Sequence, residues 1–177
     1  DEPGRRDEPI DGILGFGLFA DCLLTLDYPA NRVVIARGEL PVADGREILD
    51  FTQEHGIPQV RLEVTGIEVA ADVDAGSMAG FSLPESLASK LPLRAAPRVV
   101  GRARTVTNSF EIKAAQLNGE VRLGAHRFAD PTLDFQPLFP VANIGARVLG
   151  DFRVTFDQKH RRMRLERTGV TGESGPR

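Results

Sequence analysis

A segment of thirteen residues occurs twice in this chain. Residues 15–27 align without a gap with residues 145–157, an offset of 130, and the likeness extends to Arg32 and Arg162. Gly, Asp, Thr, Asp and Arg recur at the same places, and apolar positions match apolar ones. Each copy has the pattern of a Gly turn, a short helical turn and two strands joined by a polar turn. This repeat predicts two homologous lobes, the first represented only by its final part.

Most of the other apolar runs are short and alternate with polar residues, which is typical of β-strands. Clear cases are residues 60–64, 120–123 and 153–156. Gly, Pro, Asn or Asp separates the runs. The sequence therefore predicts an all-β protein with a few short helices.

Two short helices are expected. Ser82 and Glu85 have the spacing of a capping box and predict a helix that runs to about Leu91. A second short helix is predicted within residues 45–54.

Composition excludes several classes of function. A net charge of −3, with 41% hydrophobic and 27% charged residues, fits a globular protein and argues against a nucleic-acid binder. The basic residues between 159 and 167 alternate with Met163 and Leu165, so they are interpreted as the solvated face of a strand. No run approaches the length of about 18 apolar residues that a membrane helix needs, so no membrane span is predicted.

Cysteine usage excludes an internal disulfide, because Cys22 is the only cysteine. It lies in an apolar run and is assigned a packing role. The three histidines at 55, 126 and 160 lie in polar surroundings, so no Cys/His metal site is expected.

The domain prediction has three parts. Residues 1–38 are the C-terminal remnant of an N-terminal lobe, residues 39–168 form a second lobe, and residues 169–177 are a disordered tail. Residues 1–9 share the tail's composition, poor in apolar residues. Because the chain begins with Asp1 and shows no signal peptide, it is interpreted as a processed or cut piece.

One carboxylate stands out. Asp74 follows the apolar run 69–73 and enters a tight turn, Asp74-Ala75-Gly76-Ser77, before a second apolar run. Such a position suits the display of an acid in a cleft, although Asp in a Gly turn is also a common turn former. Asp27 and Asp157, each at a strand end, are interpreted as turn formers. A metal pair of Asp72 and Asp74 is discounted because no further ligand is evident.

A second motif is discounted. Residues 15–20 match the dinucleotide-binding pattern G-x-G-x-x-A, but no long helix follows and no acidic residue stands about 20 positions on. A structural Gly turn is predicted instead.

The pieces around Asp74 resemble the retropepsin-like aspartic proteases, in the bacterial type with two tandem lobes, over most of residues 58–166. In family order come the strand and Gly turn of residues 60–66, the loop 74–77 where the family has D-[T/S]-G-[A/S], the helix of residues 84–91, a polar hairpin at 100–112 in the place of the flap, and the closing element Ile144-Gly145. No peptide-binding residues are assigned to the flap.

The resemblance implies a retropepsin-like acid protease β-barrel lobe and an aspartic endopeptidase that uses no cofactor and no metal. Asp74 would be catalytic, with Ala75, Gly76 and Ser77 supporting it and Ser77 donating a hydrogen bond to its outer oxygen. Family members carry at position 75 a hydroxyl that ties the two lobes together, and Ala75 lacks it.

The resemblance also defines the partners. The substrate would be a peptide or protein, and the second Asp of the dyad would come from a missing N-terminal lobe or from a homodimer partner. A periplasmic or secreted bacterial location follows from the family alone. The alternative is a protease-derived domain that binds peptides or partners without cleaving them.

Overall fold

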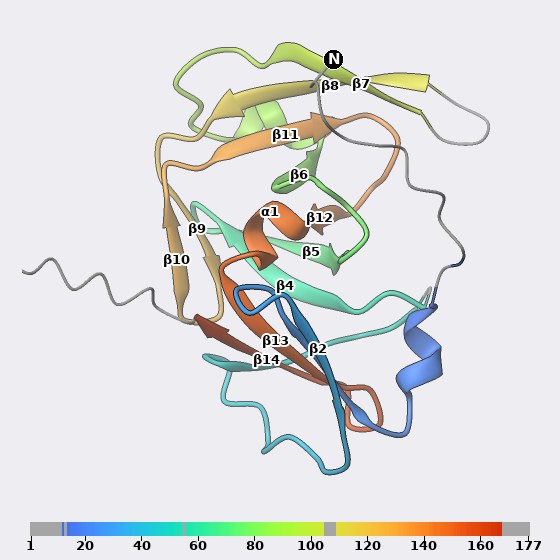
Figure 1. Cartoon of the computed structure of the whole chain (residues 1–177). Helices are drawn as coiled ribbons and strands as arrows, with labels where there is room; N and C mark the ends of the chain where they lie inside the picture. The colour runs from blue at the N-terminus through green and yellow to red at the C-terminus, as the bar shows by residue number, and fades with distance from the viewer. Residues whose placement is uncertain (1–11, 13, 55, 105–108, 168–177) are drawn as a thin grey trace, which may run out of the picture.

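The chain folds into two β-sheets joined by one core, as a computed structural model shows for residues 12, 14–54, 56–104 and 109–167 (Figure 1). The elements in chain order are η1 (Phe16–Phe19), β1 (Leu23–Asp27), β2 (Arg32–Ala36), β3 (Ile48–Asp50), β4 (Gln59–Val64), β5 (Ile67–Val73), β6 (Phe81–Pro84), η2 (Glu85–Lys90), β7 (Arg98–Arg104), β8 (Ser109–Gln116), β9 (Glu120–Leu123), β10 (His126–Ala129), β11 (Thr132–Gln136), β12 (Ala142–Ile144), α1 (Ala146–Leu149), β13 (Phe152–Asp157) and β14 (Arg162–Arg167).

The larger sheet has nine strands in the order β10-β9-β4-β5-β12-β6-β11-β8-β7, and the smaller has five in the order β2-β1-β13-β14-β3. The predicted all-β class is therefore confirmed. Strand pairing among the described residues leaves β10 and β7 as edges of the larger sheet, so hydrogen bonds do not close it into a barrel.

Alternation along the strands builds the core. In β4, Val60, Leu62 and Val64 are buried while Arg61 faces solvent, as the sequence pattern predicted. The predicted strands at 120–123 and 153–156 are confirmed as β9 and β13. Side chains from both sheets meet in one apolar cluster, so the two sheets form one folding unit.

The helix predictions are half right. A helix does follow Pro84, as η2, but Ser82 lies in β6 and no side chain caps the helix, so the predicted capping box is wrong. The predicted helix within residues 45–54 is also wrong. There the Asp44 carboxylate accepts three backbone N–H groups, those of residues 46, 47 and 48, and the chain then forms β3 against β14. Tertiary strand pairing decides this segment against its local helical pattern.

The internal repeat appears as a local twofold axis. Residues 23–27 and 153–157, which the repeat equates, pair as the antiparallel strands β1 and β13, and Thr25 stands opposite its own repeat partner Thr155. Their hydroxyls form a hydrogen bond of 2.9 Å. On either side, β2 flanks β1 as β14 flanks β13, and η1 corresponds to α1 at the same offset of 130.

The two copies differ in what covers them. In β14, Met163 and Leu165 are fully buried, whereas their counterparts in β2, Val33 and Ile35, are 61% and 60% exposed. The contrast also holds in the helical turns, where Val148 is buried and Leu18 is exposed. The body of the larger sheet covers the second copy, while the matching face of the first copy lies open in the described structure.

Asp27 and Asp157 hold the turns of the two hairpins, as predicted. Asp27 accepts hydrogen bonds from the Ala30 N–H and from the guanidinium groups of Arg32 and Arg153. Asp157 accepts from the N–H groups of Leu40 and His160. Both carboxyl groups are buried.

Acid is expected to destabilise the fold through Asp157. Burial by itself raises the pKa of this carboxyl, but hydrogen bonds from Leu40 and His160 outweigh burial and leave the pKa below its ordinary value. A native pKa below the unfolded one stabilises the fold above the unfolded pKa of about 3.9, and this stabilisation is lost as the pH falls through the native pKa. Urea unfolding at a series of pH values should show a free energy of unfolding that falls in acid, with a smaller slope in Asp157→Asn. The exposed Asp21→Asn serves as the control, and an equal slope in Asp157→Asn would contradict the assignment.

The remaining predictions concern chain segments of less consequence. The Cys22 thiol is half-buried and donates to the Phe19 carbonyl oxygen at 3.4 Å, in keeping with a packing role. The predicted disordered segments 1–9 and 169–177, His55 and the tip of the flap hairpin at 105–108 lie outside the described residues.

Candidate active site

Asp74 is the first residue after β5, and the turn that follows it holds its carboxylate. The Asp74 N–H donates to the Ile144 carbonyl oxygen at 3.0 Å, and the Asp74 carbonyl accepts the Ser77 N–H at 3.2 Å. The Gly76 N–H donates to Asp74 Oδ1 at 2.9 Å. One carboxylate oxygen is thus fixed by the backbone of its own turn.

The turn is clamped by the segment that follows β12. Ala146 N–H donates to the Ser77 carbonyl at 2.7 Å, and Arg147 N–H donates to the Ala79 carbonyl at 3.1 Å. Gly145 lies so close to this strand that a Cβ there would stand 2.4 Å from the Ala79 oxygen and 2.8 Å from the Ser77 oxygen. Glycine is required here by close backbone approach, which accounts for the Ile144-Gly145 motif of the sequence.

The second carboxylate oxygen has a partner that the sequence did not reveal. Asn143 Nδ2 donates to Asp74 Oδ2 at 3.3 Å. The Ser77 hydroxyl accepts the Ala79 N–H at 3.2 Å. Among the described residues, the amide of Asn143 stands where a hydroxyl donor was expected.

Asp74 lies in a cavity of about 300 Å³. The β7–β8 hairpin, which the sequence predicted as a flap, contributes Phe110 and Ile112 of β8 to the lining of the same cavity. Apolar and polar side chains share the lining: Ile57, Asp72, Asp74, Ser77, Ala79, Ser82, Phe110, Ile112, Asp134, Gln136, Phe139, Val141, Ala142 and Asn143. The cavity offers apolar walls and a polar floor, the usual make-up of a ligand pocket.

Part of the polar floor lies in a single row across the larger sheet, and Gln59 continues this row outside the cavity lining. Gln59, Asp72, Asn143, Ser82 and Asp134 are successive Cα partners on β4, β5, β12, β6 and β11. Burial raises the pKa of the Asp134 carboxyl above its ordinary value, and the nearby Arg147 and a hydrogen bond from the Gly80 N–H oppose this only in part. Residues far apart in the sequence therefore form the floor beside Asp74.

Ala75 does not line this cavity and lies instead beside the first repeat copy. It lines a smaller cavity together with Tyr28 and Asn31, which lie in the turn between β1 and β2. The Tyr28 hydroxyl is buried without a hydrogen-bond partner in the described part of the chain. Burial raises the pKa of this hydroxyl, and the charge of Asp74 raises it further. The first hairpin therefore reaches the edge of the candidate site.

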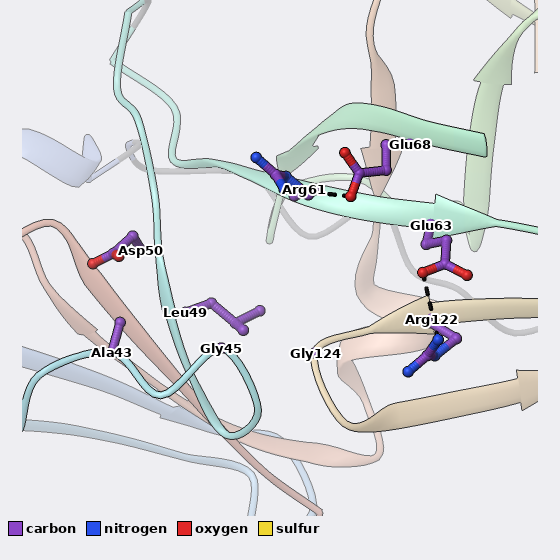
Figure 2. A pocket seen from close by; sticks show the side chains of 9 residues that line it. All are labelled: Ala43, Gly45, Leu49, Asp50, Arg61, Glu63, Glu68, Arg122 and Gly124. Carbon is purple, nitrogen blue, oxygen red and sulfur yellow. Dashed lines mark hydrogen bonds and ion pairs between the residues drawn. The ribbon is translucent and has the colours of Figure 1, made fainter. Parts of the chain in front are cut away.

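A larger cavity of about 490 Å³ lies elsewhere and is a weaker candidate. Figure 2 shows its charged lining in two ion pairs, Arg61 with Glu68 at 3.3 Å and Arg122 with Glu63 at 3.5 Å. Both arginines of this cavity are paired with carboxylates, so neither guanidinium group offers an unpaired positive charge to a ligand.

Within the described residues, no group of three His, Cys, Asp or Glu side chains is placed to hold a metal ion, and Asp72 is instead bonded by Gln59 Nε2 at 3.0 Å. No helix of the described ranges is long and apolar enough to cross a bilayer.

The comparison with solved structures decides the fold. A retropepsin-like aspartic protease from Rickettsia conorii superposes with a TM-score of 0.53 over 67% of this chain and 96% of that chain, at 16% sequence identity. The fold is retropepsin-like. No family model matches the sequence, and no curated protein matches it either.

The retropepsin-like fold agrees with the order of elements that the sequence predicted. Strand β4 with its Gly turn, the Asp74 turn, η2, the β7–β8 hairpin and the β12–α1 element follow one another as expected. At 16% identity the likeness establishes the fold and leaves the role of each site residue to be argued from its geometry.

Proposed function

We propose that this chain supplies one carboxylate of an aspartic endopeptidase dyad, with Asp74 as that carboxylate. The observation that carries the proposal is the placement of Asp74 in a retropepsin-like fold. Its side chain is held by the Gly76 N–H at the floor of a cavity walled by a hairpin. Gly76 and Ser77 shape the turn, and the substrate is a peptide or protein that lies between the Asp74 turn and β8.

The chemistry needs two carboxyl groups that share one proton across a water molecule. The ionised carboxylate takes a proton from the water while the water oxygen bonds to the peptide carbonyl carbon. The other carboxyl gives its proton to the carbonyl oxygen. The tetrahedral intermediate then breaks its C–N bond. The leaving amine takes the proton that the first carboxyl received from water, and a hydroxyl of the intermediate returns a proton to the second carboxylate, which releases the acid product and restores the dyad. Two negative charges at this separation cannot coexist, which keeps one acid and one base in the same site.

The second carboxylate is proposed to come from a further lobe packed on residues 1–38. The pairing of β1 with β13 is symmetric about a local twofold axis, and α1 and η1 stand at equivalent positions in the two copies. We propose that a lobe homologous to residues 39–168 obeys the same symmetry and packs on the open face of the first copy. Val33 and Ile35 on that face are exposed where the repeat has Met163 and Leu165 buried. In addition, two thirds of this chain matches nearly all of the Rickettsia protein, so one third of the chain has no counterpart in that lobe.

The same geometry favours a covalently linked lobe over a homodimer. The edge of β13 nearest the axis is already paired along its length with β1. A second copy that used this axis would have to displace the β1–β2 hairpin and its Thr25–Thr155 hydrogen bond. We therefore propose a two-lobed protein, meaning the natural polypeptide that carries this chain together with the proposed lobe.

Substitutions on the two repeat copies test this arrangement. In this chain alone, Leu165→Thr should lower the free energy of unfolding by about 3 kcal/mol because it places a hydroxyl in the core. Ile35→Thr should change it by about 0.5 kcal/mol or less because the side chain is exposed. In the two-lobed protein, Ile35→Thr should cost about 2 kcal/mol, since the second lobe buries that side chain. Urea unfolding measures all three, and an unchanged effect of Ile35→Thr in the two-lobed protein would remove the support for a lobe on this face.

Ala75 favours a second candidate, a peptide-binding domain that no longer cleaves. The missing hydroxyl removes hydrogen bonds between lobes that contribute roughly 0.5–1.5 kcal/mol each. The loss of this hydroxyl leaves the carboxyl of Asp74 in place. Residues of the β1–β2 hairpin line a cavity together with Ala75. Hydrolysis of a quenched-fluorescence peptide library at acid pH by the two-lobed protein separates the candidates. Cleavage supports the peptidase, and saturable binding of the same peptides without cleavage supports the binding domain.

A further inference from the structure

We infer that Asn143 is the positioning residue of Asp74 and makes it the ionised member of the dyad, the base that takes the proton from water. This inference rests on the proposed function and deepens it by assigning unequal roles to the two carboxyl groups. It concerns a residue that stands in the closing strand of the lobe rather than in the Asp74 turn.

The first argument is the set of donors around the carboxylate. Among the described residues, Gly76 N–H serves Oδ1 at 2.9 Å and Asn143 Nδ2 serves Oδ2 at 3.3 Å. The Ser77 hydroxyl accepts the Ala79 N–H and makes no hydrogen bond to Asp74 within the described structure, and position 75 carries no hydroxyl. Asn143 is thus the side-chain donor that the carboxylate has, and donors to a carboxylate favour its charged form.

The second argument is that the backbone of Asn143 is fixed. Strand β12 is held on both sides, with Asn143 opposite Asp72 of β5 and opposite Ser82 of β6. The next residue, Ile144, accepts the Asp74 N–H through its carbonyl oxygen at 3.0 Å. The strand that binds the backbone of Asp74 therefore also delivers the amide to its side chain.

The third argument concerns the orientation of the amide. Asn143 Oδ1 is buried and has no hydrogen-bond partner in the described part of the chain. The contact with Asp74 is then what selects which end of the amide faces the carboxylate, because an ionised Asp74 accepts only a donor. A protonated Asp74 would lose this preference, so the side chain of Asn143 responds to the charge of Asp74.

The other charged groups near Asp74 do not supply this donor. Asp72 and Asp134 line the same cavity as carboxyl groups, and Gln59 is occupied on Asp72. Tyr28, beside Ala75, carries a hydroxyl whose pKa is raised by burial and by Asp74. Among the described residues that line the cavity there is no Lys or Arg, so the side-chain donor to Asp74 there is the neutral amide of Asn143 and not a cation.

The consequence is an asymmetric dyad. At the position equivalent to Asn143 the first repeat copy has Ile13, whose side chain has no donor. The second carboxyl would then lack the amide donor that Asp74 has, and the inference places the shared proton on that second carboxyl. The carboxyl of the second lobe then acts as the acid toward the peptide carbonyl, and Asp74 acts as the base.

NMR of this chain alone tests the inference without requiring cleavage. In the unmodified chain, the side-chain amide signals of Asn143 should move with pH along the same curve as the carboxyl carbon of Asp74. Asn143→Leu should move the titration midpoint of Asp74 to higher pH by about one unit, the size expected for one hydrogen bond to a charged group. Ser82→Ala, the neighbour of Asn143 in the polar row, is the matched control and should leave the midpoint in place.

Two results would overturn the inference: amide signals of Asn143 that ignore the titration of Asp74, or an unchanged midpoint in Asn143→Leu. The pH dependence of the Asn143 amide signals is measured in the unmodified chain, so it tests the inference even if Asn143→Leu fails to fold. The proposed function fails separately. If the two-lobed protein cleaves no peptide while the NMR result holds, Asn143 positions a carboxylate that is not part of a peptidase. If cleavage is present and the NMR result is negative, only the asymmetry is lost.

Discussion

Replacing Asp74 by Asn in the two-lobed protein is expected to lower kcat for peptide hydrolysis by about 10⁴-fold, the upper range for one general acid–base group. The amide keeps the shape of the side chain and still accepts the Gly76 N–H. It cannot take a proton from water, and its NH₂ end would face the NH₂ end of Asn143 if the geometry were kept. KM should change little, because the walls of the cavity contributed by β8 are untouched.

The matched control is Asp72→Asn. Asp72 lies two residues earlier, on β5, lines the same cavity and accepts a hydrogen bond from Gln59, but it is outside the turn that presents Asp74. Its effect on kcat should be far smaller than that of Asp74→Asn. Steady-state kinetics on a quenched-fluorescence peptide measures kcat for both variants. Equal losses of kcat would show that the negative charge of the cavity floor, rather than Asp74 itself, supports the reaction.

Gly145→Ala is expected to destabilise this chain by about 3 kcal/mol, the upper end for inserting a methyl group into a packed site. The added Cβ would meet two backbone carbonyl oxygens, those of Ala79 and Ser77, at distances no real contact reaches. Backbone cannot swing aside as a flexible side chain can, so the clamp from Ala146 and Arg147 onto the Asp74 turn would have to open. The two-lobed protein carrying this change should also lose activity, because the carboxylate would no longer be held in place.

The repeat supplies the control for this prediction. Gly15 occupies the equivalent position in the first copy, and a Cβ there would meet nothing within 4 Å. In this chain Gly15→Ala should therefore change the free energy of unfolding by about 0.5 kcal/mol or less. Thermal or urea unfolding compares the two variants directly. A similar effect at both positions would indicate that loss of glycine flexibility, not the clash with the Asp74 strand, governs stability.

The sequence predicted the strands, the repeat and the Asp74 turn because each leaves a local signal. Alternation in β4 reflects burial on one face, and it can be read without knowing the partner strand. The repeat was recognised from identical Gly, Asp and Thr at a constant offset, and the structure gave it a physical meaning as the symmetric pairing of β1 with β13.

The predictions that failed depended on tertiary partners. Residues 45–54 form β3 instead of a helix because β14 offers an edge and Asp44 caps the turn before it. Ser82 does not cap η2 because it lies in β6, between β11 and β12. Local pattern alone does not reveal which competing interaction the folded chain supplies.

The floor of the candidate site was invisible for the same reason. Asn143, Ser82 and Asp134 come together through strand register, and no sequence spacing relates them. The one available signal was the polar Asn143 within the apolar closing element, where the first repeat copy has Ile13. A polar residue that interrupts an otherwise apolar strand next to a candidate acid is a sign of a side chain that serves that acid.

The central claim is that Asp74 is one half of a dyad whose other half lies on a lobe covering β1 and β2. A crystal structure of the two-lobed protein measures it most directly. The account predicts a second Asp carboxylate within about 3 Å of Asp74, close enough to share a proton. It also predicts that Val33 and Ile35 are buried beneath the lobe that carries this carboxylate. A structure in which Asp74 faces no second carboxylate, or faces Asp74 of another copy, would contradict the account.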